Sequence, residues 1–270
     1  MNKAGKAVGN PINYYIKYRH LLYAFIASDL KEKYAGSLVG VYWSVINPLI
    51  MIVIYTFVFS VVLKVEFHGN RSPLDFALYL ICGMLPWFAI QESVNRSAGI
   101  LEENASLVKK VNFPASLLPT HIVIGNMFTM LITLVLFIAF VALRMDTFSS
   151  KLVFLPFVII CQLILTLGLS LTVASLNVIF PDTKPLVQNF MLLWMFITPI
   201  FYPSAVFPKE FGFLLAINPL AHLVDLYREV IMKNNLPIDS FTSLIGVSVA
   251  IFLLGYLIFA RMQAKFVDLM

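Results

Sequence analysis

The sequence predicts an all-α integral membrane protein with six transmembrane helices. Of its 270 residues, 60% are hydrophobic and only 12% are charged, and its mean hydropathy of +0.88 lies far above that of soluble globular domains. Long windows without a charged residue recur along the chain, and a helix needs about 20 apolar residues to cross a bilayer. These windows must be helical, because hydrocarbon offers no hydrogen-bond partner to the edge of an open sheet.

Six apolar windows make up one transmembrane domain that covers residues 1–270. We expect spans at residues 38–63, 76–99, 117–143, 152–180, 186–203 and 240–260. The second charge-free window is the shortest, and we expect its flanking Asp75 and Glu92 to lie in the headgroup layers. Lysine and arginine are more numerous in the connections on the N-terminal side of the membrane than on the other side. The positive-inside rule therefore predicts that both termini are cytoplasmic, with residues 1–37 forming a cytoplasmic N-terminus.

Two segments outside the spans are apolar enough to contact the membrane. Residues 21–35 begin with an apolar run and end in alternating charge, which predicts an interfacial helix along the inner leaflet; the alternative is a solvated N-terminal helix. Residues 204–235 contain two short apolar stretches, which predict a pair of re-entrant helices on the outer side. The second stretch opens with Asn218-Pro219-Leu220, where we expect the proline to start a helix rather than to kink one.

A third segment, residues 102–113, is charged and lies between two very apolar stretches. Glu102 and Glu103 precede Lys109 and Lys110, an order that complements a helix macrodipole. The apolar residues recur at helical spacing on one face, Asn104 suits an N-cap and Pro114 stops the helix; this face carries Leu101, Ala105, Val108 and Val111. The four charges cancel, which argues against an anionic-lipid anchor, and so short a helix needs support. We therefore interpret the segment as a cytoplasmic helix that docks on a protein partner.

The sequence lacks the motifs that would let this chain carry out chemistry of its own. It contains no Gly-x-x-x-x-Gly-Lys-Ser/Thr loop for a nucleotide, no His-Glu-x-x-His and no carboxylate cluster for a metal. Cys82 and Cys161 lie inside apolar runs, which indicates buried thiols. The net charge of +5 comes from basic residues at the ends of apolar segments, which argues against a nucleic-acid partner. Because the charge-free windows also lack the ionisable groups of ion-driven transporters, we expect the energy source on another chain.

Aromatic residues distinguish the first and fifth spans. They belong either to an interfacial belt and the packing around it, or to a pore wall on which sugar rings slide, because aromatic faces pack against the C–H faces of pyranoses. The candidates for the pore wall are Tyr42, Trp43, Tyr55 and Phe59 in the first span, and Trp194, Phe201 and Tyr202 in the fifth.

Four stretches of this sequence resemble the membrane subunit of type 2 ABC exporters. They are DLKEKYAGSLVGVYWSVINPLIMIVIYTFVFS from Asp29, GMLPWFAIQESVNRSAGILEENASLVKKVNFP from Gly83, LNVIFPDTKPLVQ from Leu176 and NPLAHLVDLYREVI from Asn218. The resemblance covers almost the whole chain and is closest to permeases that export O-antigen and other polysaccharides. Relatives commonly have an arginine before the aspartate in the loop after the fourth span, whereas this chain has Pro181 before Asp182. No charge role is therefore carried over to that position.

The resemblance implies a homodimer with a pore at the subunit interface. It also implies two copies of a separate cytoplasmic ATPase, which would hold ATP and magnesium, so that this chain carries no cofactor and no catalytic residue. In such exporters the cytoplasmic helix between the second and third spans is a coupling helix that rests in a cleft of the ATPase. That role would fall here on Asn104, Ala105, Leu107, Val108, Lys109, Lys110, Val111 and Phe113. The interface helix would be a second contact, through Phe25, Asp29, Lys31, Lys33 and Tyr34.

The resemblance further implies a lipid-linked polysaccharide of O-antigen type as cargo, carried on undecaprenyl pyrophosphate across the bacterial inner membrane. We expect the outer re-entrant pair to gate the exit, with Pro219, Asp225, Arg228 and Glu229 as candidate residues. Alternative cargoes are teichoic acid, a capsular glycan, a drug or a small lipid, and the short outer loops do not separate them. A membrane-embedded enzyme acting on isoprenoid lipids is disfavoured, because no Asp, Glu or His residues cluster at membrane depth.

Overall fold

The computed structural model shows an all-helical chain, as the composition predicts. It describes residues 16–34, 73–110, 113–144 and 149–269, together with positions 43, 46, 49, 50, 53, 54 and 57–62. No strand occurs in these ranges. The α-helices are α2 (Arg19–Tyr34), α4 (Pro73–Glu103), α5 (Ala105–Val108), α6 (Leu117–Arg144), α7 (Leu155–Ile179), α8 (Thr183–Ile197), α9 (Gly212–Ile217), α10 (Pro219–Met232), α11 (Ile238–Met262) and α12 (Phe266–Leu269). The shorter helical turns are η3 (Phe57–Val62), η4 (Ser150–Phe154), η5 (Ser204–Val206), η6 (Lys209–Phe211) and η7 (Gln263–Lys265).

Four helical stretches are long and apolar enough to cross a membrane. They are Phe76–Glu103, Leu117–Ala142, Ser150–Ile179 and Ile238–Lys265. These stretches cover the spans expected at 76–99 and 240–260, and they cover all but the last residue of the spans expected at 117–143 and 152–180. The span expected at 38–63 lies largely outside the described residues.

Helix α8 is shorter than the span expected at 186–203. It has 15 residues and ends at Ile197, which gives it a length of about 22 Å, against about 30 Å of hydrocarbon. The backbone becomes extended at Thr198, where ψ is 133°. Pro199 explains this change, because a proline lacks the N–H that would continue the helix and disfavours helical backbone in the residue before it. The expected span therefore continues as turns rather than as helix beyond residue 197.

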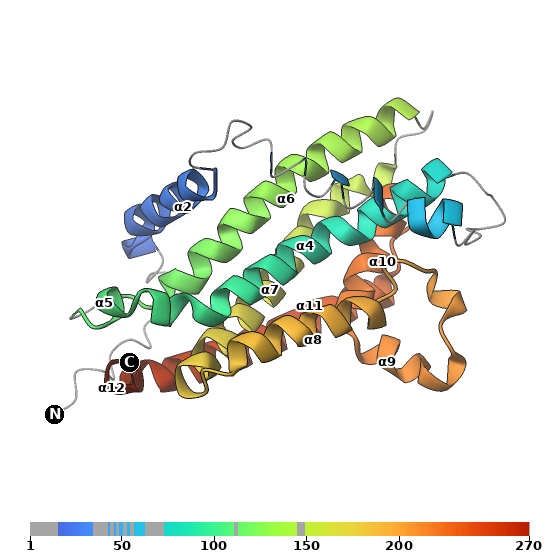
Figure 1. Ribbon diagram of the computed structural model, residues 1–270. Coiled ribbons are helices and arrows are strands. Elements are labelled where there is room, and N and C mark those ends of the chain that lie inside the picture. The colour runs from blue at the N-terminus through green and yellow to red at the C-terminus, as the bar shows by residue number, and fades with distance from the viewer. Residues whose placement is uncertain are drawn as a thin grey trace.

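The long helices run side by side as a bundle (Figure 1). Helices α5 and α12 and the C-terminus gather at one end of the bundle, which we call the α5 end, whereas α9 and α10 lie at the other, the α10 end. Helix α4 is central, because 72% of its apolar window is buried inside the chain, compared with 22% for α11. Helix α2 lies beside α6, on the half of α6 that is nearer the α5 end.

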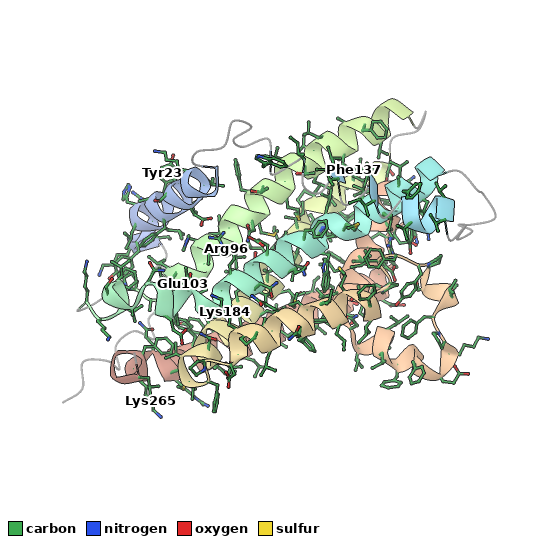
Figure 2. All side chains as sticks on the ribbon, in the orientation of Figure 1. Tyr23, Arg96, Glu103, Phe137, Lys184 and Lys265 are labelled. Carbon is green, nitrogen blue, oxygen red and sulfur yellow. The ribbon has the colours of Figure 1, made fainter. Side chains whose placement is uncertain are left out.

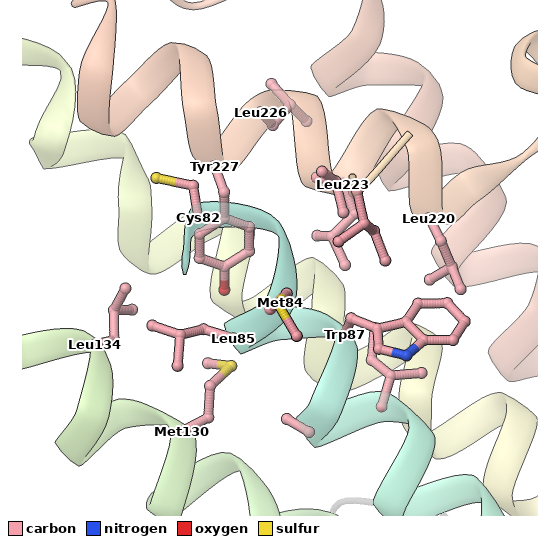
Figure 3. Packing of buried hydrophobic residues seen from close by; sticks show 14 of the residues in the cluster. Cys82, Met84, Leu85, Trp87, Met130, Leu134, Leu220, Leu223, Leu226 and Tyr227 are labelled. Carbon is pink, nitrogen blue, oxygen red and sulfur yellow. The ribbon is translucent and has the colours of Figure 1, made fainter. Parts of the chain in front are cut away.

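The main hydrophobic core lies where α4, α6, α7 and α10 meet. Trp87 and Met84 of α4 pack near Leu223 and Tyr227 of α10 (Figure 3), and all four side chains are almost completely buried. Ten of the 14 residues of α10 are buried. Helix α10 is therefore part of the packed core of the described chain rather than a helix on its surface.

Helices α7 and α11 cross at two glycines with their backbones almost in contact. A Cβ atom added to Gly255 would lie 2.2 Å from the carbonyl oxygen of Gly168, and one added to Gly168 would lie 2.6 Å from Cα of Phe252. No larger side chain fits at either position without moving one helix away from the other. Small residues allow such close approach between helices in membranes, where van der Waals packing replaces the hydrophobic driving force.

Candidate functional site

The α5 end of the bundle contains the segment expected to dock on a partner, but the segment is not one helix from 102 to 113. Helix α4 continues through Glu102 and Glu103, and the chain turns at Asn104 before the single helical turn of α5. The Asn104 side chain makes no cap bond to α5. Its Nδ2 instead donates to the carbonyl oxygen of Ile100 at 3.0 Å. The same carbonyl oxygen also accepts from the Asn104 backbone N–H at 3.2 Å, so the backbone and the side chain of Asn104 both bind the last turn of α4.

The apolar face of α5 packs against the same chain and is not free for a partner. Val108 is 5% exposed and lies in a second hydrophobic cluster with residues of α4, α6, α7, α11, α12 and the turn before α6, namely Ile100, Leu101, Ala115, Leu118, Ile122, Leu171, Ala174, Val178, Phe259 and Phe266. This corrects the expectation that Val108 faces a partner, while Val111 lies outside the described residues. The cluster provides the support that so short a helix needs. Ala105 and Leu107 are half-buried, and the exposed side chains of the segment are Glu102, Glu103, Ser106, Lys109 and Lys110.

Helix α2 packs next to this segment, so the two regions expected to meet a partner lie together. The Phe25 ring lies 6.3 Å from the ring of Phe113 and 5.4 Å from that of His121, measured between centroids. Asp29 of α2 forms an ion pair with Arg96 of α4, with Nη1 3.2 Å from Oδ2. Lys31 is exposed. Lys33 and Tyr34 belong to the last turn of α2, but their side chains lie outside the described part.

A second ion pair at the α5 end joins α4 to α8. The Lys184 Nζ lies 2.9 Å from Oε1 of Glu103 (Figure 2), and the Lys184 backbone N–H donates to Oδ1 of Asn177 at 3.0 Å. These bonds fix the turn between α7 and α8 beside the end of α4. Sequence reasoning did not find this pair, because 81 positions separate its members and neither belongs to a motif.

At the α10 end, Arg228 binds the non-helical backbone that follows α8. Its side chain is 3% exposed, and Nη1 and Nη2 donate to the carbonyl oxygens of Pro199 and Ile200 at 2.6 and 2.9 Å. Its guanidinium carbon lies 3.5 Å from the centroid of the Tyr79 ring of α4, and Nη1 lies 3.6 Å from Oδ1 of Asp225. Irregular backbone at membrane depth requires such donors, because lipid supplies none.

Asn218 is the second connection between α8 and α10. Its Nδ2 donates to Oγ1 of Thr198 at 3.0 Å, while its Oδ1 accepts from Nε1 of Trp194 at 2.9 Å. The same oxygen accepts from the N–H of Leu220 at 3.0 Å, which caps α10 with Pro219 in its first turn. The expectation that Asn218-Pro219-Leu220 starts a helix is therefore confirmed.

Among the described residues, the aromatic side chains expected to line a pore differ in how accessible they are. Phe201 is 1% exposed and packs in the core, so its assignment to a pore wall is wrong for the described chain. Trp194 is half-buried and bound to Asn218, and the Tyr202 hydroxyl donates to the carbonyl oxygen of Phe196 at 2.8 Å. Trp43 is 38% exposed. The remaining candidates lie outside the described residues, entirely or by their side chains: Tyr42, Tyr55 and Phe59.

Two of the four candidate gate residues are buried in the core, and the other two lie on the accessible face of α10. Pro219 and Arg228 are buried, whereas Asp225 and Glu229 are half-buried on one face of the helix. Glu229 is paired with Lys233 at 2.7 Å and accepts from Nδ2 of Asn235 at 2.9 Å. Within the described ranges, no three His, Cys, Asp or Glu side chains form a group that could hold a metal ion. Cys82 and Cys161 are buried free thiols.

Comparison with known proteins identifies the family. Residues 20–232 match the family described as "ABC-2 type transporter". The chain belongs to the ABC-2 type transporter family. Among its relatives, the O-antigen export system permease protein RfbA of Myxococcus xanthus is 30% identical over 255 residues, which cover 93% of this chain and 96% of the relative. The protein of the same name from Klebsiella pneumoniae is 31% identical over 251 residues, 93% and 95% of the two chains, and the polysialic acid transport protein KpsM of Escherichia coli is 24% identical over 216 residues, 77% and 80%.

As an ABC-2 chain, the protein is a membrane permease, the component of a transporter that crosses the bilayer. The ABC-2 match begins in α2 and ends at the last residue of α10. The Asp29–Arg96 pair, the α5 segment, the Glu103–Lys184 pair and the Arg228 contacts all lie within the matched residues. Helices α11 and α12 lie beyond it.

Proposed function

We propose that this chain is the channel-forming permease of an ATP-driven exporter that moves a lipid-linked polysaccharide of O-antigen type across the bacterial inner membrane. The observation that carries the proposal is the near full-length similarity to two permeases named for O-antigen export. The similarity to a polysialic acid transport protein also favours a glycan cargo. Teichoic acid, a capsular glycan, a drug or a small lipid remain alternative cargoes.

In this proposal the working exporter is a homodimer of this chain with two copies of a separate ATPase. ATP and magnesium belong to the ATPase, because this chain has no P-loop in its sequence. The membrane part of each subunit has six crossings, to which the residues at 38–63 contribute the first and α8 with the turns after it the fifth. Helices α9 and α10 form the re-entrant pair on the outer side, and both termini lie in the cytoplasm.

The α5 end is then the cytoplasmic end, and the two exposed lysines of the α5 segment are the proposed contact with the ATPase. Since Val108 is occupied by the chain's own core, docking depends on the two accessible lysines that follow it, Lys109 and Lys110. Two adjacent lysines favour an acidic surface on the partner. Helix α2, held against α6 by Phe25 and against α4 by Asp29, widens the same contact.

The cargo in this proposal is carried on undecaprenyl pyrophosphate and passes through a pore between the two copies. Of the three fifth-span candidates, Trp194 and Tyr202 are accessible enough to meet a sugar ring. The lipid carrier and the surrounding membrane lipids would contact the exposed apolar faces of the bundle.

The test is to express the chain with its candidate ATPase in a strain that lacks its own O-antigen permease. We expect the ATPase to co-purify with the wild-type chain and O-antigen to reach the cell surface. Reversing both charges, Lys109→Glu with Lys110→Glu, should reduce co-purification and export together. Lys209→Glu, which reverses an exposed charge at the α10 end, is the matched control and should change neither.

Three results would contradict the proposal. An unchanged complex after the double charge reversal would remove these lysines from the ATPase contact. Surface O-antigen that stays absent although the complex hydrolyses ATP would favour one of the alternative cargoes. Turnover of an isoprenoid lipid by the purified chain without its ATPase would favour a membrane enzyme instead.

A further inference from the structure

Helix α8 is packed loosely along its length but bound at both ends. Of its residues, only Met191 and Met195 are buried, whereas ten of the 14 residues of α10 are. Its side chains therefore interlock little with the bundle. The polar contacts described above hold its first turn to the end of α4, and the backbone after its last turn to α10.

The contact at the α5 end is the Glu103–Lys184 ion pair. It is weak, and each of its charges lies at the helix end where the macrodipole opposes it. Glu103 is the last residue of α4 and Lys184 lies in the first turn of α8. An acid at a helix C-terminus and a base at a helix N-terminus both oppose the helix macrodipoles. The two side chains are 56% and 43% exposed, and such exposed pairs contribute little to folding stability. The pair therefore stabilises neither helix by itself, and its clear structural effect is to join them.

Gly99 provides the space for this ion pair. A Cβ atom added to Gly99 would lie 2.8 Å from both Oε1 of Glu103 and Nζ of Lys184. These two atoms are the ends of flexible side chains, which can move aside without displacing the backbone. A methyl group at this position would therefore separate the two charges and leave the helices in place.

The contact at the α10 end is strong and buried. The carbonyl oxygens of Pro199 and Ile200 accept from the guanidinium of Arg228, and Asn218 binds both Thr198 and Trp194. Hydrogen bonds from a charged donor are about twice as strong as neutral ones, and the two bonds from Arg228 have almost no access to water. The C-terminal end of α8 and the helix α10 should therefore move as one body, while the contact at the α5 end can open and close.

We propose that α8 transmits movement from the α5 end to α10, with the Glu103–Lys184 pair as its releasable contact and Arg228 with Asn218 as its fixed one. The inference rests on the proposed function, because it takes the α5 end to be where the ATPase acts. Movement of the α4 end beside α5 pulls on the first turn of α8 through the ion pair, and α8 carries the displacement to α10. Lys184 and Arg228 are thus positioning residues for transport.

The test measures export per ATP hydrolysed in the complete complex of permease and ATPase. Lys184→Gln removes one charge of the pair, and Gly99→Ala separates the pair without removing a charge. Both should retain co-purification and ATP hydrolysis while export per ATP falls about fivefold or more, the lower range of coupling between sites. Exchanging the charges, Glu103→Lys with Lys184→Glu, should restore export, because it rebuilds the pair in the orientation that both macrodipoles favour. Asp182→Asn removes an exposed charge that makes no cap bond to α8 and should have no effect.

The outcomes separate this inference from the proposed function. Unchanged export per ATP in both Lys184→Gln and Gly99→Ala would overturn the role of α8, as would a charge exchange that fails to restore export. Loss of co-purification in either single variant would assign the pair to docking and would also overturn it. A wild-type chain that neither binds the ATPase nor exports a glycan would instead contradict the proposed function.

Discussion

Replacing Arg228 with lysine should destabilise the chain strongly although it keeps the charge. The arginine makes two hydrogen bonds to main-chain carbonyls at 2.6 and 2.9 Å and lies over the Tyr79 ring. Lysine presents a compact charge on a flexible stem, so it cannot reach both carbonyls and stack on the ring at once. We expect it to lose one charge-assisted hydrogen bond of about 1.5–3 kcal/mol and much of a desolvated cation–π contact of about 2 kcal/mol.

The expected total loss for Arg228→Lys is about 3 kcal/mol, because a relocated ammonium recovers part of the gross loss. For a chain of this size each kcal/mol lowers the midpoint of thermal unfolding by about 2–4 °C, so the shift should be about 6–12 °C. The assay is thermal unfolding of the purified permease in detergent, followed by the loss of the monodisperse species at one fixed heating rate. Arg261→Lys on α11 is the control, because Arg261 is exposed, and it should stay within about 0.5 kcal/mol of the wild type. A shift below about 2 °C for Arg228→Lys would refute the assignment of the two carbonyl bonds.

Three further substitutions test the packing in the same unfolding assay. Gly255→Ala should lower the free energy of unfolding by about 1–3 kcal/mol, because the added methyl group overpacks against Gly168. Gly246→Ala on the same helix is the control and should be neutral or stabilising, because nothing lies within 4 Å of the added atom. Equal effects of the two substitutions would contradict the close crossing of α7 and α11. Val108→Ala should lower the free energy of unfolding by about 2 kcal/mol, because it removes buried apolar surface and leaves a cavity. An unchanged stability would indicate that Val108 lies on the surface. Asn234 has a φ of 49°, so alanine there should destabilise by about 1 kcal/mol more than glycine, a difference that vanishes if the left-handed backbone is absent.

The sequence predicted the elements whose causes are local. Hydropathy located the four apolar stretches, because burial in hydrocarbon acts on every residue of a window. The start of α10 could also be predicted from the sequence, because the Asn218 side chain caps the helix by accepting from the N–H of Leu220, only two residues later. The end of α8 also has a local cause, because Pro199 disfavours helical backbone at Thr198. A hydropathy window does not detect this helix end, because the residues after it are still apolar.

The contacts that give these elements their roles depend on residues far apart in the chain. Val108 looked like a docking residue because its partners, such as Phe259 and Phe266, are remote in sequence. Glu102 and Glu103 looked like a helix start because charge order alone does not show that α4 extends to them. The Arg228 contacts needed both the break after α8 and the placement of α10 in the core. No periodic pattern in a single sequence contains that information.

The burial of Arg228 also sets an order for assembly in the membrane. A lone arginine is expensive to place in hydrocarbon. Besides Asp225 of its own helix, its partners here are the Tyr79 ring of α4 and the carbonyls of Pro199 and Ile200. All three precede Arg228 in the chain, so they are synthesised before it. Packing of α10 onto the bundle is then a late step, because its binding site is formed by α4 and by the backbone that follows α8. A chain with a defect in that binding site would leave Arg228 with only Asp225 of its own helix as a partner, and quality-control proteases can act on an undocked helix.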